Sequence, residues 1–214
     1  MKNKISEYKL IIVDMDGTLY YQTPLRLYML KKLILHIIKN NIKGLREVLL
    51  VSEFRKLREN SALTVEEACN SLSKSKNLSF DYISGVINKW IMEEPLNGLV
   101  RFKDDILCDI LNTCNNKNSI VTIFSDYPAE DKCKALNISF PSYHANQEEI
   151  NALKPSPKGI KYIMKLNNIT DSSSVLMIGD RESRDGKSAD AAGCDKLILP
   201  KSKRERKAIY STLL

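Results

Sequence analysis

The sequence predicts an α/β protein, with a Rossmann-like parallel sheet and an all-helical segment inserted after the first strand. Two observations support this fold class. Short β-branched apolar runs alternate with helical patterns along most of the 214 residues. Between about residues 23 and 96 the alternation stops, and only helical patterns remain. We therefore expect a core domain formed by residues 1–22 and 97–214, and a helical domain formed by residues 23–96.

Four apolar runs have the length and composition of buried strands: residues 8–13, 119–124, 174–178 and 196–199. The first run ends at Asp14-Met15-Asp16-Gly17, which is typical of a tight turn. Helical patterns lie between the later runs, at residues 129–136 and 157–166. For the second of these we expect Ser156 as the N-cap and Pro157 at the first helical position. Strands that alternate with helices imply parallel β-α-β units.

The inserted segment predicts helices at about residues 25–39, 43–59, 64–73 and 80–93. Its first helix carries an apolar stripe at helical spacing, which consists of Leu27, Leu30, Ile34, Ile37 and Ile38. We expect this stripe to pack inside a helical bundle.

The formal net charge is +7, and the excess of basic residues is uneven. Residues 25–58 contain nine Lys or Arg and two Glu, and a second basic cluster occupies residues 201–207. A solvated helix face explains the second cluster. For the first, a solvated face and attraction of an anionic ligand both stay open. A membrane-surface role is disfavoured because the apolar side of this segment lacks Trp and Phe.

The five cysteines show no close spacing, and there are two histidines, so zinc and redox motifs are excluded. We expect reduced thiols in a soluble, cytoplasmic protein. No uncharged apolar run approaches the ~18–20 residues that cross a bilayer. The first residues also lack the apolar core of a signal peptide.

Polar side chains follow the predicted strands: Asp14, Asp16 and Thr18 after the first, Ser125 and Asp126 after the second, and Asp180 and Asp185 after the third. Lys154 precedes the helix that begins near Pro157. Ligands of open α/β sheets bind beyond the carboxyl ends of the strands, so we expect these groups to converge. Gathered carboxylates repel one another unless a hard cation such as Mg²⁺ offsets their charge. The sequence therefore predicts a magnesium site that receives a phosphate.

Four motifs in this order resemble those of the haloacid dehalogenase (HAD) superfamily. They are Asp14-Met15-Asp16-Gly17-Thr18-Leu19, Ser125, Lys154, and Gly179-Asp180 with Asp185. The resemblance covers about residues 8–24 and 98–200. It implies that Asp14 is a nucleophile that forms an aspartyl-phosphate. It also implies that Asp16 protonates the leaving group and then deprotonates the attacking water.

The same resemblance implies roles for the other motif residues. Thr18, Ser125 and Asp126 would bind the phosphoryl group, together with nearby backbone N–H groups. Lys154 would steady both the nucleophile and the phosphoryl group. The implied Mg²⁺ ligands are Asp14, Asp16 through its backbone carbonyl, Asp180 and Asp185.

The carbon–halogen hydrolases of this superfamily lack the second Asp of the first motif, whereas this sequence has Asp16. The resemblance therefore implies a Mg²⁺-dependent phosphatase acting on a small phosphorylated metabolite. It also implies that residues 23–96 form a helical cap of the C1 type. Candidate substrate contacts are Tyr20, Tyr21, Gln22, Arg26 and His36, for each of which ordinary packing is the alternative. Arg181 and Arg184 could bind substrate or pair with nearby carboxylates.

Two other functions stay open. A phosphomutase or phosphotransferase would pass the phosphoryl group to a substrate hydroxyl instead of water. A non-catalytic protein that binds a partner or nucleic acid through the basic helices would not need the intact motifs. We expect a small phosphorylated substrate, no membrane partner and no nucleic acid.

Overall fold

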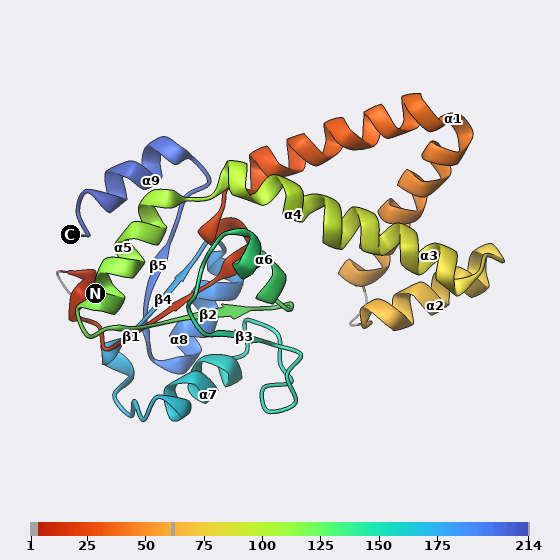
Figure 1. The fold of residues 1–214 in the computed structure, drawn as a ribbon. Helices are drawn as coiled ribbons and strands as arrows, with labels where there is room; N and C mark the ends of the chain where they lie inside the picture. Colours follow the sequence, from red (N-terminus) through yellow and green to blue (C-terminus); the bar gives the residue numbers. More distant parts are fainter. Residues whose placement is uncertain (1–3, 61–62, 214) are drawn as a thin grey trace. The chain divides into compact units, whose positions relative to one another are not determined.

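The computed structural model describes residues 4–60 and 63–213. The chain divides into two compact units, one built from the chain up to Thr23 and from Leu99 onward, and one from Pro24–Gly98. The predicted fold class is confirmed: the first unit is a five-stranded parallel sheet with helices, and a helical segment is inserted after its first strand (Figure 1). The two units are described separately below.

The sheet of the first unit consists of β1 (Leu10–Val13), β2 (Ile120–Ser125), β3 (Ser142–His144), β4 (Val175–Gly179) and β5 (Asp195–Ile198). Its strand order is β3-β2-β1-β4-β5, and every pairing is parallel. Val13 pairs with Ile123 of β2 and with Ile178 of β4, so β1 lies at the centre. The sequence did not predict β3, because this strand has three residues and lacks a continuous apolar run.

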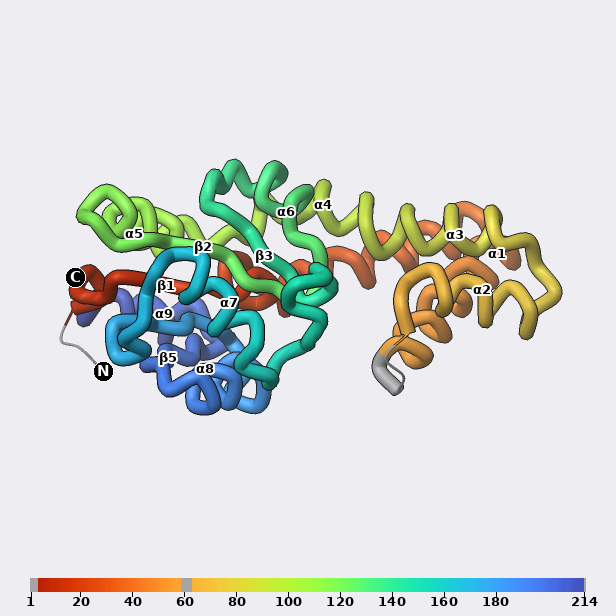
Figure 2. The backbone as a smooth tube through the Cα atoms, turned by 90° about the horizontal axis from the view of Figure 1, so that it is seen from below, coloured from red at the N-terminus to blue at the C-terminus, as the bar shows by residue number. Residues whose placement is uncertain are grey.

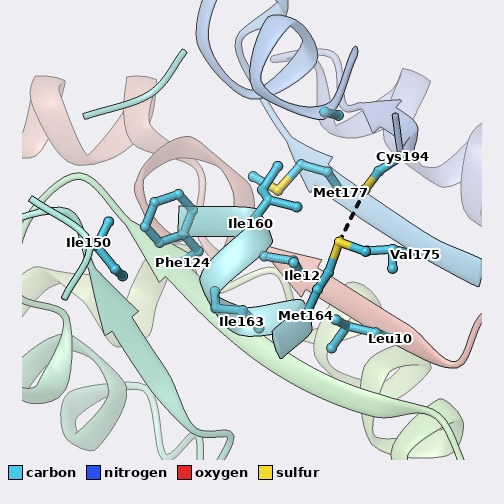
Figure 3. Close-up of a cluster of buried hydrophobic side chains, with 11 residues drawn as sticks. Leu10, Ile12, Phe124, Ile150, Ile160, Ile163, Met164, Val175, Met177 and Cys194 are labelled. Carbon is cyan, nitrogen blue, oxygen red and sulfur yellow. Dashed lines mark hydrogen bonds between the residues drawn. The ribbon is translucent and has the colours of Figure 1, made fainter. Parts of the chain in front are cut away.

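The helices of this unit are α5 (Asp105–Asn116), α6 (Glu130–Ala135), α7 (Lys158–Leu166), α8 (Lys187–Ala192) and α9 (Lys203–Tyr210). Figure 1 shows α7 and α8 on one side of the sheet and α5 and α9 on the other. Under α7, the buried cluster in Figure 3 joins Ile160 and Ile163 to Leu10 and Ile12 of β1. Burying such side chains contributes about 1.5–3 kcal/mol each. This packing holds the polar carboxyl edge of the sheet in place.

The predicted cap of α7 is wrong. The helix begins at Lys158, its N-cap residue is Pro157, and no side chain caps it. The Ser156 hydroxyl accepts only a long hydrogen bond, of 3.4 Å, from the Lys158 N–H. The Ser156 carbonyl instead accepts a 2.9 Å hydrogen bond from the Ser188 hydroxyl of α8. Ser156 thus links two helices instead of starting one.

The second unit contains α1 (Gln22–Asn60), α2 (Val65–Lys76), α3 (Phe80–Ile87) and the start of α4 (Glu94–Leu99). Asn41 interrupts α1 with a φ of 51°, so α1 consists of two helices in sequence. Thr64 and Glu67 form a capping box at the start of α2. A π-helical stretch, Asn88–Glu93, joins α3 to α4, and Figure 2 shows these elements along one helical path.

The predicted packing of the apolar stripe on α1 is wrong. Leu27, Leu30, Ile34 and Ile38 are 49–68% exposed. The opposite side of the same helix supplies the buried residues, among them Met29. The packing of α1 also uses polar groups: His36 bonds to the Glu47 carboxylate at 2.9 Å and stacks edge-on against Trp90. Across residues 4–60 and 63–213, no helix has the length and apolar content to cross a membrane.

Candidate active site

The first motif lies where the order of strand connections reverses. β1 pairs with β2 on one side and β4 on the other, and Asp14 directly follows β1. The Asp14 N–H donates to the Ile178 carbonyl of β4 at 2.8 Å, so its backbone continues the sheet. Ligands of open α/β sheets bind at such a switch point. Asp14 is 2% exposed, and its carboxylate is therefore fixed at the carboxyl edge of the sheet.

Lys154 links the first and fourth motifs. Its ammonium group lies 2.5 Å from an oxygen of Asp14 and 2.6 Å from an oxygen of Asp185. Its backbone N–H donates to the Asp126 carboxylate at 3.0 Å, which fixes the loop that carries it. Lys154 is 1% exposed. Burial alone would lower the pKa of Lys154, but Asp14 and Asp185 outweigh burial and raise it above its ordinary value.

A group of three carboxylates meets the ordinary requirements of a cation site. Oxygens of Asp14, Asp180 and Asp185 all lie within 4.8 Å of one another. Oδ1 of Asp180 is buried and accepts no hydrogen bond from the described residues. The nearest guanidinium nitrogen, Nε of Arg181, is 3.7 Å away. One lysine does not balance three carboxylates. These donors therefore fit Mg²⁺, a hard cation that prefers oxygen ligands.

Burial governs the charge of these carboxylates. Burial raises the pKa of Asp14 to about 7; Lys154 opposes this shift, and Asp185 and Asp16 add to it. Burial also raises the pKa of Asp180, against the opposing charge of Arg181. A bound divalent cation favours the ionised carboxylates. Cation binding and carboxylate ionisation are therefore linked at this edge.

Gly17 allows the motif loop to lie against the fourth motif. Its φ is 92°, a backbone conformation that favours glycine. A Cβ atom at this position would collide with the Asp180 carboxylate. The turn after Asp14 therefore requires glycine for two independent reasons.

The Asp16 carboxylate is not part of the three-carboxylate group. It accepts a 2.5 Å contact from the Lys132 ammonium of α6 and a 2.6 Å hydrogen bond from the Tyr20 hydroxyl. Burial would raise the pKa of Asp16, but Lys132 and the Tyr20 hydroxyl outweigh burial and lower it below its ordinary value. An ionised Asp16 is suited to accept a proton. Tyr20, a candidate for substrate contact, thus orients a motif residue.

The residues expected to bind phosphate differ in their surroundings. Thr18 is buried, and its hydroxyl donates to the Asp14 carboxylate at 3.2 Å. Ser125 ends β2, and its hydroxyl accepts a 3.3 Å hydrogen bond from the Tyr127 N–H. The Asp126 carboxylate receives the Lys154 N–H and also pairs with two arginines, Arg184 at 3.2 Å and Arg181 at 3.5 Å.

These pairs bear on the alternatives for Arg181 and Arg184. Both arginines pair with carboxylates, and Arg181 also lies near Asp180. The nearby Glu182 pairs with Lys196 at 2.6 Å instead.

A second buried cation supports the motif loop from below. Arg206 of α9 is 1% exposed; it donates to the Thr18 carbonyl at 2.9 Å and also to the Gly17 carbonyl. Its guanidinium pairs with Asp104 at 3.0 Å, and the Tyr210 hydroxyl donates to the same carboxylate at 2.7 Å. The expectation of a wholly solvated C-terminal basic cluster is therefore wrong for Arg206. Its basic neighbours at 201, 203, 204 and 207 are exposed, as predicted.

The chain matches the haloacid dehalogenase-like hydrolases over residues 8–193, so it belongs to that family. No curated protein matches it in sequence. Among solved structures, it resembles YfnB from Bacillus subtilis, a proposed HAD hydrolase bound to magnesium. Identity is 16%, the match covers 97% of this chain and 99% of that one, and the TM-score is 0.61.

Two further structures have related folds and different chemistries. A 2-haloacid dehalogenase from Pseudomonas syringae is 16% identical, with 90% and 86% of the two chains covered and a TM-score of 0.61. A predicted phosphatase from Clostridium acetobutylicum is 13% identical, with 94% and 90% covered and a TM-score of 0.53. At such identities the likeness establishes the fold alone. The choice between reactions depends on the residues at the site.

Proposed function

We propose that this chain is a Mg²⁺-dependent phosphatase that hydrolyses a small phosphorylated metabolite through an aspartyl-phosphate. The observation that carries the proposal is the gathering of Asp14, Asp180 and Asp185 beside the Lys154 ammonium. A nucleophilic carboxylate, a cation site and a fixed positive charge are what phosphoryl transfer requires.

In the first step, an oxygen of Asp14 attacks phosphorus in line with the leaving alcohol, and the phosphorus–oxygen ester bond breaks. Asp16, protonated for this step, gives its proton to the leaving oxygen. In the second step, Asp16 takes a proton from water, the water oxygen attacks phosphorus, and Asp14 is released with inorganic phosphate. Mg²⁺ held by Asp14, Asp180, Asp185 and the Asp16 carbonyl would offset the charge of the phosphoryl oxygens.

Other residues position the phosphoryl group in this proposal. The Thr18 and Ser125 hydroxyls and the backbone N–H groups after Ser125 would hold its oxygens. The Asp126 carboxylate is already paired with two arginines, so we assign Asp126 a contribution through its backbone. Lys154 would balance charge on Asp14 and on the transferred group.

Asp16 favours phosphatase over dehalogenase chemistry. A halide leaves without a proton, whereas an alkoxide leaving group needs one, and Asp16 stands two residues after the nucleophile. We also propose that residues 23–96 form a cap that selects the substrate, because they follow the first motif directly in the chain. The core would then be residues 1–22 and 97–214.

The test is phosphate release from a panel of sugar, glycolate and nucleoside phosphates, with Mg²⁺ and with a chelator. We expect release only with Mg²⁺, and a loss of ~10³-fold or more in Asp14→Asn. The matched control is Asp109→Asn, which removes an exposed carboxylate of α5. Release that persists in Asp14→Asn or in chelator contradicts the proposal. Product isomerisation without phosphate release supports a mutase instead.

A further inference from the structure

The side of α1 away from its packed face carries an unusual concentration of aliphatic side chains. Among the described residues, sixteen large hydrophobic side chains are exposed, and half of them belong to this one helix. They are Leu27, Leu30, Ile34, Leu35, Ile38, Ile42, Leu45 and Leu49, with exposed fractions of 46–69%. Exposed apolar groups that gather on one element mark an interaction site more often than scattered ones do.

The spacing of these side chains forms two stripes. Leu27, Leu30, Ile34 and Ile38 follow one another at intervals of three or four residues, so they lie along one side of the helix before Asn41. Ile42, Leu45 and Leu49 repeat the spacing after the break. The residues that α1 buries, such as Met29 and Phe54, occupy the other side. We call the seven residues of these two stripes the apolar stripe of α1.

Positive charges lie beside the apolar stripe. Arg26, Lys31, Lys39, Lys43, Arg46 and Lys56 are exposed, and none has an ion-pair partner among the described residues. The acidic side chains described on α1 are both paired: Glu47 with His36 at 2.9 Å, and Glu53 with Lys76 at 2.9 Å. The surface is thus aliphatic and cationic at once.

We propose that the apolar stripe of α1 and its flanking cations bind an anionic lipid surface, with the helix lying in the interface and not crossing it. An amphipathic helix of this kind inserts aliphatic side chains among the acyl chains while Lys and Arg contact the headgroups. Sequence reasoning disfavoured this role because Trp and Phe are absent. The exposure of seven aliphatic side chains supplies apolar area without them.

Charge and chemistry separate a lipid surface from other occupants. A second copy of the chain would bring two cationic surfaces together, which is unfavourable. Nucleic acid is bound through phosphates by Lys and Arg, and it offers little apolar surface to an aliphatic stripe. The chain outside residues 24–98 contains 21 basic and 18 acidic residues, so it is not an anionic partner either.

The test is flotation of the full chain with vesicles of phosphatidylcholine alone and with vesicles that contain about 30% phosphatidylglycerol. We expect binding to the anionic vesicles only, reduced at least tenfold by raising the salt from about 0.1 M to about 0.5 M. Ile34→Ser with Ile38→Ser should abolish binding. Lys31→Gln, Lys39→Gln and Lys43→Gln together should weaken it by about two orders of magnitude.

Two control variants have matched chemistry. Lys201→Gln, Arg204→Gln and Lys207→Gln remove the same charge from exposed positions of the C-terminal cluster. Leu153→Ser with Leu166→Ser remove two exposed aliphatic side chains from the core unit. Both should bind as the parent does. Circular dichroism and the melting temperature confirm that each variant is folded.

Several outcomes overturn the proposal. Absence of binding to either vesicle does so, as does equal loss in the matched controls. A dimer that Ile34→Ser with Ile38→Ser dissociates, without vesicle binding, assigns the stripe to a second copy. Binding of a duplex oligonucleotide that the serine variant leaves intact, without vesicle binding, assigns the cations to nucleic acid. Vesicle binding is measured without turnover, so its result is independent of the proposed phosphatase activity.

Discussion

Two cations of the core, Lys154 and Arg206, are each 1% exposed, yet their partners differ. Lys154 lies between two motif carboxylates, so its charge serves the site where a substrate phosphate would bind. Arg206 pairs with Asp104 and donates to carbonyl groups of the motif loop. A planar guanidinium with five donors suits several fixed acceptors, whereas an ammonium suits one point of negative charge. We infer that Arg206 acts through the position of the loop.

Arg206→Ala should lower the free energy of unfolding by about 3–5 kcal/mol, because it leaves Asp104 buried without its cation. Arg206→Lys should restore only part of the loss, because an ammonium cannot reach the same set of acceptors. Urea denaturation measures both changes. Arg204→Ala, at an exposed position of the same helix, is the control and should change stability by about 0.5 kcal/mol or less. Equal effects at 204 and 206 would contradict the assignment.

At the scale of elements, α6 contributes to the site through Lys132, which contacts Asp16 at 2.5 Å. In Lys132→Gln the pKa of Asp16 should rise towards its ordinary value, because the opposing positive charge is gone. If Asp16 is the proton donor to the leaving group, the alkaline limb of kcat/KM against pH should then move to higher pH. The measurement is the pH profile of phosphate release by the Mg²⁺-loaded enzyme.

The control for this change lies on the same helix. Lys134 is 81% exposed and pairs only with Asp131 among the printed ion pairs, at 3.5 Å. Lys134→Gln removes the same charge and should leave the pH profile unchanged. A profile that Lys132→Gln also leaves unmoved would show that Lys132 has no influence on the proton-transferring group.

The sequence predicted the elements whose patterns are local. The central strands are continuous apolar runs, and the helical segment has clear periodicity, so both were predicted. Strand β3 was missed because its three residues carry no such pattern. The apolar stripe of α1 was assigned to a bundle because periodicity identifies an amphipathic helix but not which of its sides is covered. Structure was needed to show that Met29 faces inward and Ile34 outward.

The same division holds for the site. Asp14, Asp180 and Asp185 were expected together because parallel strands end at one edge, and they lie within 4.8 Å. Lys132 and Arg206 were not singled out, because their contacts with the motif loop span 116 and 188 residues of sequence. Nothing in a basic cluster indicates which of its members is buried. Long-range ion pairs are thus the part that local patterns do not carry.

At the scale of the whole molecule, the buried carboxylates link stability to pH. The pKa of Asp14 is raised in the folded state, from 3.8 to about 7, so the folded chain binds more protons than the unfolded chain across that window. This contribution to stability is present at low pH and is lost as the pH rises through about 7. The raised pKa of Asp180 acts in the same direction. A cation at the site offsets the loss by binding only the folded state.

Asp14→Asn should therefore be more stable than the parent chain at about pH 8 in chelator, by on the order of 2 kcal/mol, and the difference should shrink towards about pH 5. The reason is that asparagine keeps the shape of the side chain without the buried charge. Urea denaturation at the two pH values measures the difference, with Asp109→Asn as the control that should show none. Adding Mg²⁺ should raise the stability of the parent more than that of Asp14→Asn. A parent chain that gains stability relative to Asp14→Asn as the pH rises in chelator would contradict this account, because it would mean that the folded state favours an ionised Asp14 without a metal ion.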